Sequence, residues 1–171
     1  DLQNKISSMN LLLGKKVDGI ILVGSNFIYE KDKDNKYIAD AATQIPIMVL
    51  NASYSAPNVY SVLCDDYASM YEATSRMIAC GTTDLLYFYN STSFSAKKKL
   101  AGFQAAMEDK NCLKSEAQLQ FFKGSPEDIP GMAKQLLKLH EAGVEFHGIL
   151  AADDNLAMAA VKYAKEAGIS I

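Results

Sequence analysis

The sequence lacks the short motifs that mark most nucleotide-binding and hydrolytic enzymes. It contains no GxGxxG, no GxxxxGK[ST] and no GxSxG. Its two histidines, His140 and His147, belong to neither an HExxH motif nor a cluster with metal-ligand spacing. Dinucleotide binding, P-loop chemistry and serine hydrolysis therefore have no signature here. We expect no metal, no cofactor and no enzyme activity.

Long apolar runs, basic charge and paired cysteines are scarce as well. No apolar run approaches the ~20 residues that span a bilayer, so we expect no membrane segment. The net charge is −3 and the pI is about 5.4, which excludes the basic footprint of a nucleic-acid-binding surface. Cys64, Cys80 and Cys112 are odd in number and form no CxxC. They indicate reduced, buried thiols in a cytoplasmic protein.

Short apolar runs alternate with segments of helical period along the whole chain. The predicted strands are 17–23, 45–50, 59–64, 84–89, 118–122 and 147–152, with 169–171 as a further strand. Unbroken alternation of this kind predicts an α/β fold with parallel sheets whose two faces are covered by helices. A length of 171 residues allows one domain or two small lobes. The polar loop that follows Tyr89 favours two lobes, 1–90 and 91–171.

The stretch from His147 to Ile169 carries the clearest functional pattern. A buried strand ends at Asp153-Asp154, and a helix with one apolar side follows and stops at Gly168. Open α/β sheets form ligand crevices just beyond the carboxyl ends of their strands, so these carboxylates are candidate ligand contacts. The alternative is that both are only helix caps. A weak internal echo aligns residues 18–26 with 147–155, as expected for two similar lobes.

An ordered set of segments resembles one known family. The segments are Lys16–Leu22, Ile45–Asn51, Val62–Gly81, Lys99–Met107, Ala152–Ala157 and Glu166–Ile171. Together they resemble the effector-binding core of LacI/GalR-type transcriptional regulators, which has a type I periplasmic-binding-protein fold. The resemblance implies two Rossmann-like parallel-sheet lobes, incomplete in this chain. Residues 1–90 would lack the first strand–helix–strand of their lobe, and residues 91–171 would lack the last strands of theirs.

The resemblance also implies a function. It predicts a ligand-sensing domain that binds a small polar, sugar-like effector between two lobes. Effector binding would switch the operator affinity of a homodimer, with DNA contacted by a helix-turn-helix that is absent from this chain. Two alternatives remain open: a solute-binding protein of a sugar ABC transporter, and an enzyme on a doubly wound α/β sheet that uses Asp153 or Asp154 as acid or base.

The ligand-binding residues follow from the same resemblance. They are Asp154, Lys99, Ser93, Ser95, Ser25, Asn26 and Asp65. Asp154 would accept hydrogen bonds, and Lys99 would donate in the place where the family usually has an arginine. Lysine offers a point charge rather than a planar fork, which changes how the effector is held. Each residue also has a structural alternative, namely a helix cap for Asp65, a solvated face for Lys97–Lys99 and turn hydroxyls for the serines. The aromatic run 87–89 is either core or a ligand platform.

Overall fold

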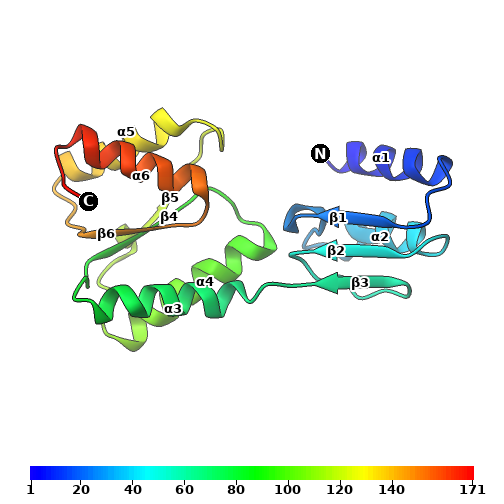
Figure 1. The fold of residues 1–171 in the computed structure, drawn as a ribbon, viewed down its shortest axis with the longest axis horizontal. Helices are drawn as coiled ribbons and strands as arrows, with labels where there is room; N and C mark the ends of the chain where they lie inside the picture. Colours follow the sequence, from blue (N-terminus) through cyan, green and yellow to red (C-terminus); the bar gives the residue numbers. More distant parts are fainter. The chain divides into compact units, whose positions relative to one another are not determined.

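The computed structural model describes all residues 1–171 and divides them into two compact units. The first contains Asp1–Asp65 together with Ser93–Ser95, and the second contains Asp66–Thr92 and Ala96–Ile171. Each unit is built on a three-stranded parallel sheet (Figure 1). This confirms the predicted α/β fold with two parallel sheets.

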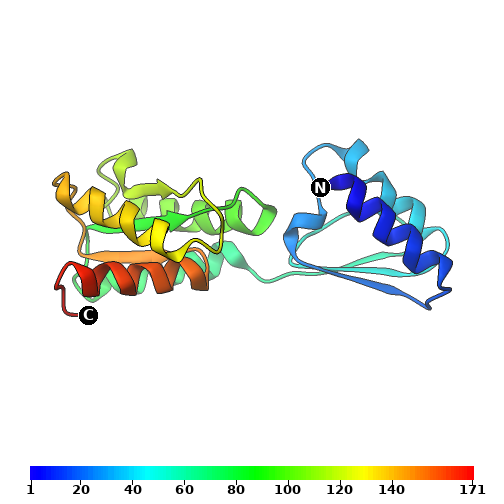
Figure 2. The same cartoon turned by 90° about the horizontal axis from the view of Figure 1, so that it is seen from above.

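The first unit forms a sheet in the order β1-β2-β3. Its elements are α1 (Leu2–Gly14), β1 (Ile20–Val23), the short 3-10 helix η1 (Ser25–Phe27), α2 (Asp32–Ala42), β2 (Ile47–Leu50) and β3 (Val59–Val62). Alternate residues of the strands, such as Ile20 and Ile47, face a core that they share with Met9 of α1 and Ile38 of α2. Figure 2 shows the two helices side by side along the sheet.

Only one face of this sheet is covered by residues 1–171. On the other face, Ile21 and Val23 of β1 are 62% and 70% exposed. Met48, Tyr60 and Val62 of the neighbouring strands are exposed on the same side. The expectation that helices cover both faces is therefore wrong for this unit, because α1 and α2 pack on the same face.

The second unit has helices on both faces of its sheet, which has the order β5-β4-β6. Its elements are α3 (Asp66–Ala79), β4 (Leu85–Tyr89), α4 (Phe94–Asp109), η2 (Glu116–Gln118), β5 (Leu119–Phe121), α5 (Ile129–Glu141), β6 (Gly148–Ala151) and α6 (Asp154–Glu166). Helices α5 and α6 pack on Leu86 and Phe88, and α3 and α4 pack on Leu85 and Tyr87 (Figure 1). The continuous apolar run of β4 follows from this arrangement, since a strand buried on both faces has no solvent side.

The boundary between the units lies between β3 and α3, earlier than the expected division into 1–90 and 91–171. β4 is the central strand of the second sheet and pairs with β5 and β6, so α3 and β4 belong to the second unit. The polar loop after Tyr89 leads from β4 into α4. Local sequence pattern missed this because strand pairing joins segments that are distant along the chain.

Some local expectations are also corrected. The sequence predicts that Gly14 stops a helix over residues 1–14, but α1 continues through Gly14, and Lys16 takes the left-handed conformation, with a φ of 55°. Residues 169–171 form no strand. The cysteines were expected to be buried, but only one of them is: Cys112 is buried, whereas Cys64 and Cys80 are exposed. The two exposed thiols follow the ends of β3 and α3, where the chain has left the cores.

Candidate functional site

Three of the predicted site residues lie at the carboxyl edge of the first sheet. Ser25 and Asn26 open η1 directly after β1, and Asp65 follows β3 just before α3. β2 separates these two strands, and all three strands are parallel, so their carboxyl ends share one edge. Asn26 is exposed and Ser25 is half-buried, and neither side chain forms a hydrogen bond within the chain.

Glycine is required at the turn that presents these two residues. Gly24 has a φ of 119°, which a residue with a Cβ adopts only under strain. A Cβ at this position would also lie 3.1 Å from Oδ1 of Asn26. The backbone N–H of Gly24 donates to the carbonyl of Leu50 at 3.2 Å, which ties the turn to the end of β2.

The acidic pair after β6 divides into two different roles. Asp153 is the N-cap of α6, and its carboxylate accepts a hydrogen bond from the backbone N–H of Leu156 at 3.0 Å. Asp154 begins the helix, is exposed and forms no hydrogen bond or ion pair. Of the two alternatives that the sequence left open, capping therefore applies to Asp153 alone. Asp154 has a carboxylate available to a ligand.

Lys99 reaches the same turn from α4. Its ammonium group donates a hydrogen bond to the carbonyl of Ala152 at 3.0 Å, and Ala152 directly precedes the acidic pair. An ammonium carries three donors, so this bond leaves others unused. The structure therefore brings both Lys99 and Asp154 to the carboxyl end of β6.

The two serines lie where β4 leads into α4. Ser93 precedes the helix and Ser95 is in its first turn, one turn before Lys99 on the same helix. The hydroxyl of Ser95 forms no hydrogen bond within the chain. Ser93 and Ser95 group with the first unit, whereas Lys99 and Asp154 belong to the second.

Two buried polar groups near the carboxyl end of β4 were not among the predicted site residues. The hydroxyl of Tyr87 and Nδ2 of Asn90 are buried and have no hydrogen-bond partner. Tyr87 is fully buried and stacks on Phe103 with ring centroids 5.1 Å apart, as expected for a core aromatic. Burial, with the charges of Asp66 and Asp153 among the smaller causes, raises the pKa of Tyr87. The signals available in the sequence were the aromatic run 87–89 and the position of Asn90 as the first residue after the strand.

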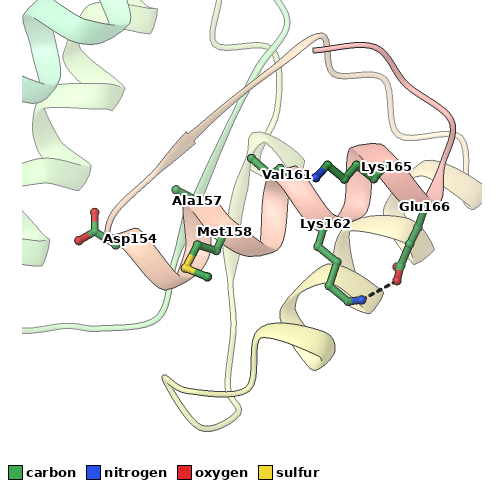
Figure 3. Close-up of a pocket in the computed structure, with 7 residues that line it drawn as sticks. All are labelled: Asp154, Ala157, Met158, Val161, Lys162, Lys165 and Glu166. Carbon is green, nitrogen blue, oxygen red and sulfur yellow. Dashed lines mark ion pairs between the residues drawn. The ribbon is translucent and has the colours of Figure 1, made fainter.

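A hollow of about 640 Å³ runs along the outer side of α6. Figure 3 shows its lining: Asp154, Ala157, Met158, Val161, Lys162, Lys165 and Glu166. All of them come from one helix, so the hollow is a surface groove rather than an enclosed cavity. Lys162 and Glu166 form an ion pair across one end at 2.8 Å. Asp154 lies at the other end of the helix.

The two histidines form separate pairs in the second unit. Nδ1 of His140 lies 2.7 Å from the hydroxyl of Tyr163, and Nδ1 of His147 lies 3.5 Å from a carboxylate oxygen of Asp84. No group of three or more histidine, cysteine or acidic side chains is arranged to hold a metal ion. None of the helices is both long enough and apolar enough to cross a membrane.

Comparison with known proteins identifies the family. The family model described as periplasmic binding proteins and sugar binding domain of LacI family matches residues 1–171. The chain belongs to this family. One relative is an HTH-type transcriptional regulator of Lachnoclostridium phytofermentans, 36% identical over 171 residues, which are 100% of this chain and 50% of that protein. Another is the HTH-type transcriptional regulator AscG of Escherichia coli, 27% identical over 165 residues, which are 96% of this chain and 47% of that protein.

The LacI-family chain described here thus spans about half the length of the curated relatives it matches. Those relatives are transcriptional regulators rather than enzymes. Two solved structures share the fold. A sugar-binding LacI-family regulator from Escherichia coli, complexed with phosphate, has a TM-score of 0.77 at 24% identity over 99% of this chain and 59% of that chain. A transcription regulator from Lactobacillus plantarum has a TM-score of 0.79 at 20% identity over 99% of this chain and 61% of that chain.

Proposed function

We propose that residues 1–171 belong to the effector-sensing part of a LacI-family transcriptional regulator. A small polar, sugar-like molecule binds to this part and shifts a homodimer between states of high and low affinity for operator DNA. DNA is contacted by a helix-turn-helix outside residues 1–171, and the protein works in the cytoplasm. The family match over the whole chain and the HTH-type names of the relatives support this function. They also favour a regulator over a transport-type solute-binding protein.

The observation that carries the proposed ligand site is the contrast between the two aspartates after β6. Asp153 is occupied as a cap, while the carboxylate of Asp154 is exposed and has no partner. A carboxylate accepts strong hydrogen bonds from hydroxyl donors, and these are the groups that a sugar offers. The side-chain polar groups are likewise without a hydrogen-bond partner in Ser25, Asn26 and Ser95. The proposed set is completed by Lys99, Ser93 and Asp65.

Regulation then requires a difference in affinity. A ligand shifts a two-state equilibrium only if it binds one state more tightly than the other. An effector held by the side chains of strand-end turns meets this condition when the turns are arranged correctly in only one of the two dimer states. The effector and the operator then influence each other's binding reciprocally.

The test is a thermal-shift screen of the full-length protein against D-glucose, D-galactose, D-ribose, cellobiose and adenosine. A ligand at one hundred times its Kd stabilises the native state by about 2.7 kcal/mol, which raises Tm measurably. We expect at least one compound to do so. In Asp154→Ala the shift should disappear while the Tm of the ligand-free protein changes little, because Asp154 has no partner to lose.

Glu166→Ala is the matched control. Glu166 is an acidic residue at the opposite end of α6, and its removal breaks only the exposed pair with Lys162, worth about 0.3–0.5 kcal/mol. This variant should keep the ligand-induced shift. An unchanged shift in Asp154→Ala would remove Asp154 from the site, and no shift with any compound in the wild type would contradict a sugar-like effector.

A further inference from the structure

The loop that follows β1 is held in place by side chains from both helices of the first unit. This segment, residues 24–29, is called here the 24–29 loop, and it carries Ser25 and Asn26. Lys5 of α1 and Asn35 and Tyr37 of α2 contact it. All of these contacts lie within the first unit.

Asn35 holds the end of the loop. It is almost completely buried, with 2% of its surface exposed. Its Oδ1 accepts a hydrogen bond from the backbone N–H of Tyr29 at 2.7 Å, and its Nδ2 donates to the backbone carbonyl of the same residue at 2.8 Å. One side-chain amide thus satisfies both polar groups of one peptide residue, as a neighbouring strand would do.

Tyr37 and Lys5 hold the middle of the loop. The hydroxyl of Tyr37 donates to the carbonyl of Phe27 at 2.9 Å, and the ring is buried. The ammonium of Lys5 donates to the carbonyl of Asn26 and lies over two aromatic rings, 5.2 Å from the centroid of Phe27 and 4.5 Å from that of Tyr29. A cation over two ring faces is attracted by both quadrupoles, so Lys5 joins α1 to three residues of the loop.

The hydrogen bonds among these contacts engage the main chain of the loop, and none of the contacts involves the side chains of Ser25 and Asn26. The hydrogen bonds go to the backbone of Asn26, Phe27 and Tyr29, while the side chains of Ser25 and Asn26 remain without a partner. A loop fixed in this way does not have to be ordered when a ligand arrives. The conformational entropy is lost during folding and not during binding, which favours affinity.

We propose that Lys5, Asn35 and Tyr37 are positioning residues for the effector site: they preorganise the 24–29 loop so that Ser25 and Asn26 are presented to the ligand. The proposal deepens the proposed function and rests on it, because it takes these two side chains as ligand contacts. Lys5 is the residue to test, since it is only half-buried and its replacement spares the core.

The experiment compares Lys5→Met, Lys5→Arg and Lys36→Met in the full-length protein. Lys36 is the matched control, because it lies on α2 between Asn35 and Tyr37 in sequence but is exposed and forms none of the hydrogen bonds or ring contacts to the loop. Hydrogen exchange is measured at the amides of Phe27, Ile28 and Tyr29. We expect exchange about ten times faster in Lys5→Met, unchanged exchange in Lys36→Met, and near wild-type exchange in Lys5→Arg, which keeps a cationic donor.

The second measurement is calorimetric titration with the compound that stabilises the wild type in the thermal-shift screen. Its affinity should fall about tenfold in Lys5→Met and recover in Lys5→Arg, with no comparable loss of apo Tm. Tyr37→Phe, which removes only the hydroxyl, should shift exchange and affinity in the same direction.

The outcomes separate the two proposals. Unchanged exchange at residues 27–29 in Lys5→Met would overturn the positioning role. Faster exchange with undiminished affinity would also overturn it, because the loop would then be irrelevant to the effector. If no compound in the screen binds the wild type, the proposed function fails, while the exchange comparison still decides whether Lys5 orders the loop.

Discussion

At the residue scale, identical neighbours differ in role because their backbone conformations differ. Asp153 has φ −150° and ψ 175°, an extended conformation that lets its carboxylate fold back onto the first turn of α6. Asp154 is already helical, so its side chain points away from those amides. Either aspartate could have been the cap on sequence grounds. Only the position where the helix begins decides which carboxylate is left for a ligand.

A pH dependence is expected from Asp84, which precedes β4. Its hydrogen-bonded ion pair with Lys114, aided by the nearby His147, holds the pKa of Asp84 below its ordinary value. A carboxyl whose pKa is lower in the folded state stabilises the protein above its unfolded pKa, and this stabilisation is lost as the pH falls through the folded pKa. The contribution should therefore be complete at pH 6–7 and should decline below about pH 4.

Asp84→Asn tests this expectation. Urea unfolding of wild type and variant is measured from pH 3 to pH 7, and the difference between their unfolding free energies is plotted against pH. The difference should be constant near neutrality and should shrink in acid. A difference in unfolding free energy that stays the same from pH 3 to pH 7 would show that the charge of Asp84 in this ion pair adds nothing to stability. Glu127→Gln, at an exposed acidic residue with no ion pair, is the control.

At the scale of elements, α3 and α4 approach each other closely at Gly102. A Cβ there would lie 2.3 Å from the carbonyl oxygen of Tyr67 and 3.1 Å from the backbone nitrogen of Tyr71. Glycine is needed because the surface of α4 rests directly on the first turns of α3. This contact places the amino end of α3 beside the helix that carries Lys99.

Two glycine substitutions should therefore have opposite effects. Gly102→Ala should lower the free energy of unfolding by about 1–3 kcal/mol, since the methyl group forces backbone apart in a packed interface. Gly14→Ala should raise it by about 0.4–1 kcal/mol, because Gly14 ends α1 with no atom within 4 Å of a new Cβ and alanine restricts the unfolded chain. Chemical denaturation of both variants is the measurement. An unchanged or higher free energy of unfolding in Gly102→Ala would mean that the approach of α4 to α3 is not tight.

At the scale of the whole molecule, the buried side chains form separate cores. One cluster lies in the first unit around Ile47 and Ile38, and two lie on the opposite faces of the sheet in the second unit, around Leu86 and Leu85. Proteins with several cores open locally as well as globally, in units that follow the clusters. The first sheet is expected to open more easily than the second, because no residue of 1–171 covers one of its faces.

A pair of core variants should reveal this division. Ile47→Ala and Leu86→Ala each remove a fully buried aliphatic side chain, and each should cost about 2–5 kcal/mol locally. Native-state hydrogen exchange of the full-length protein should show the loss in β1–β3 for the first variant and in β4–β6 for the second. Equal losses in both sheets from either variant would show a single cooperative unit.

Much of this architecture could be predicted because it follows from the spacing of apolar residues within each segment. The apolar run before Asp153 and the helical spacing after it predicted β6 and α6, with the acidic pair just beyond the end of the strand. The sequence could not predict that Asn35 binds the backbone of Tyr29 or that the hydroxyl of Tyr37 donates to the loop. Nor could it predict that the hydroxyl of Tyr87 is buried without a partner. Each depends on a contact between segments that the sequence separates.

The sequence by itself determined the order and type of elements, the parallel α/β class and the family, because hydrophobic period and ordered motifs are properties of the chain as written. The tertiary structure alone decided that β4 belongs to the second sheet, that Asp153 rather than Asp154 is the cap, and that Lys5 reaches the loop after β1. The physical reason is the same in each case. Strand pairing, capping geometry and long-range side-chain contacts depend on which surfaces pack together after folding. The local order of residues does not specify that packing.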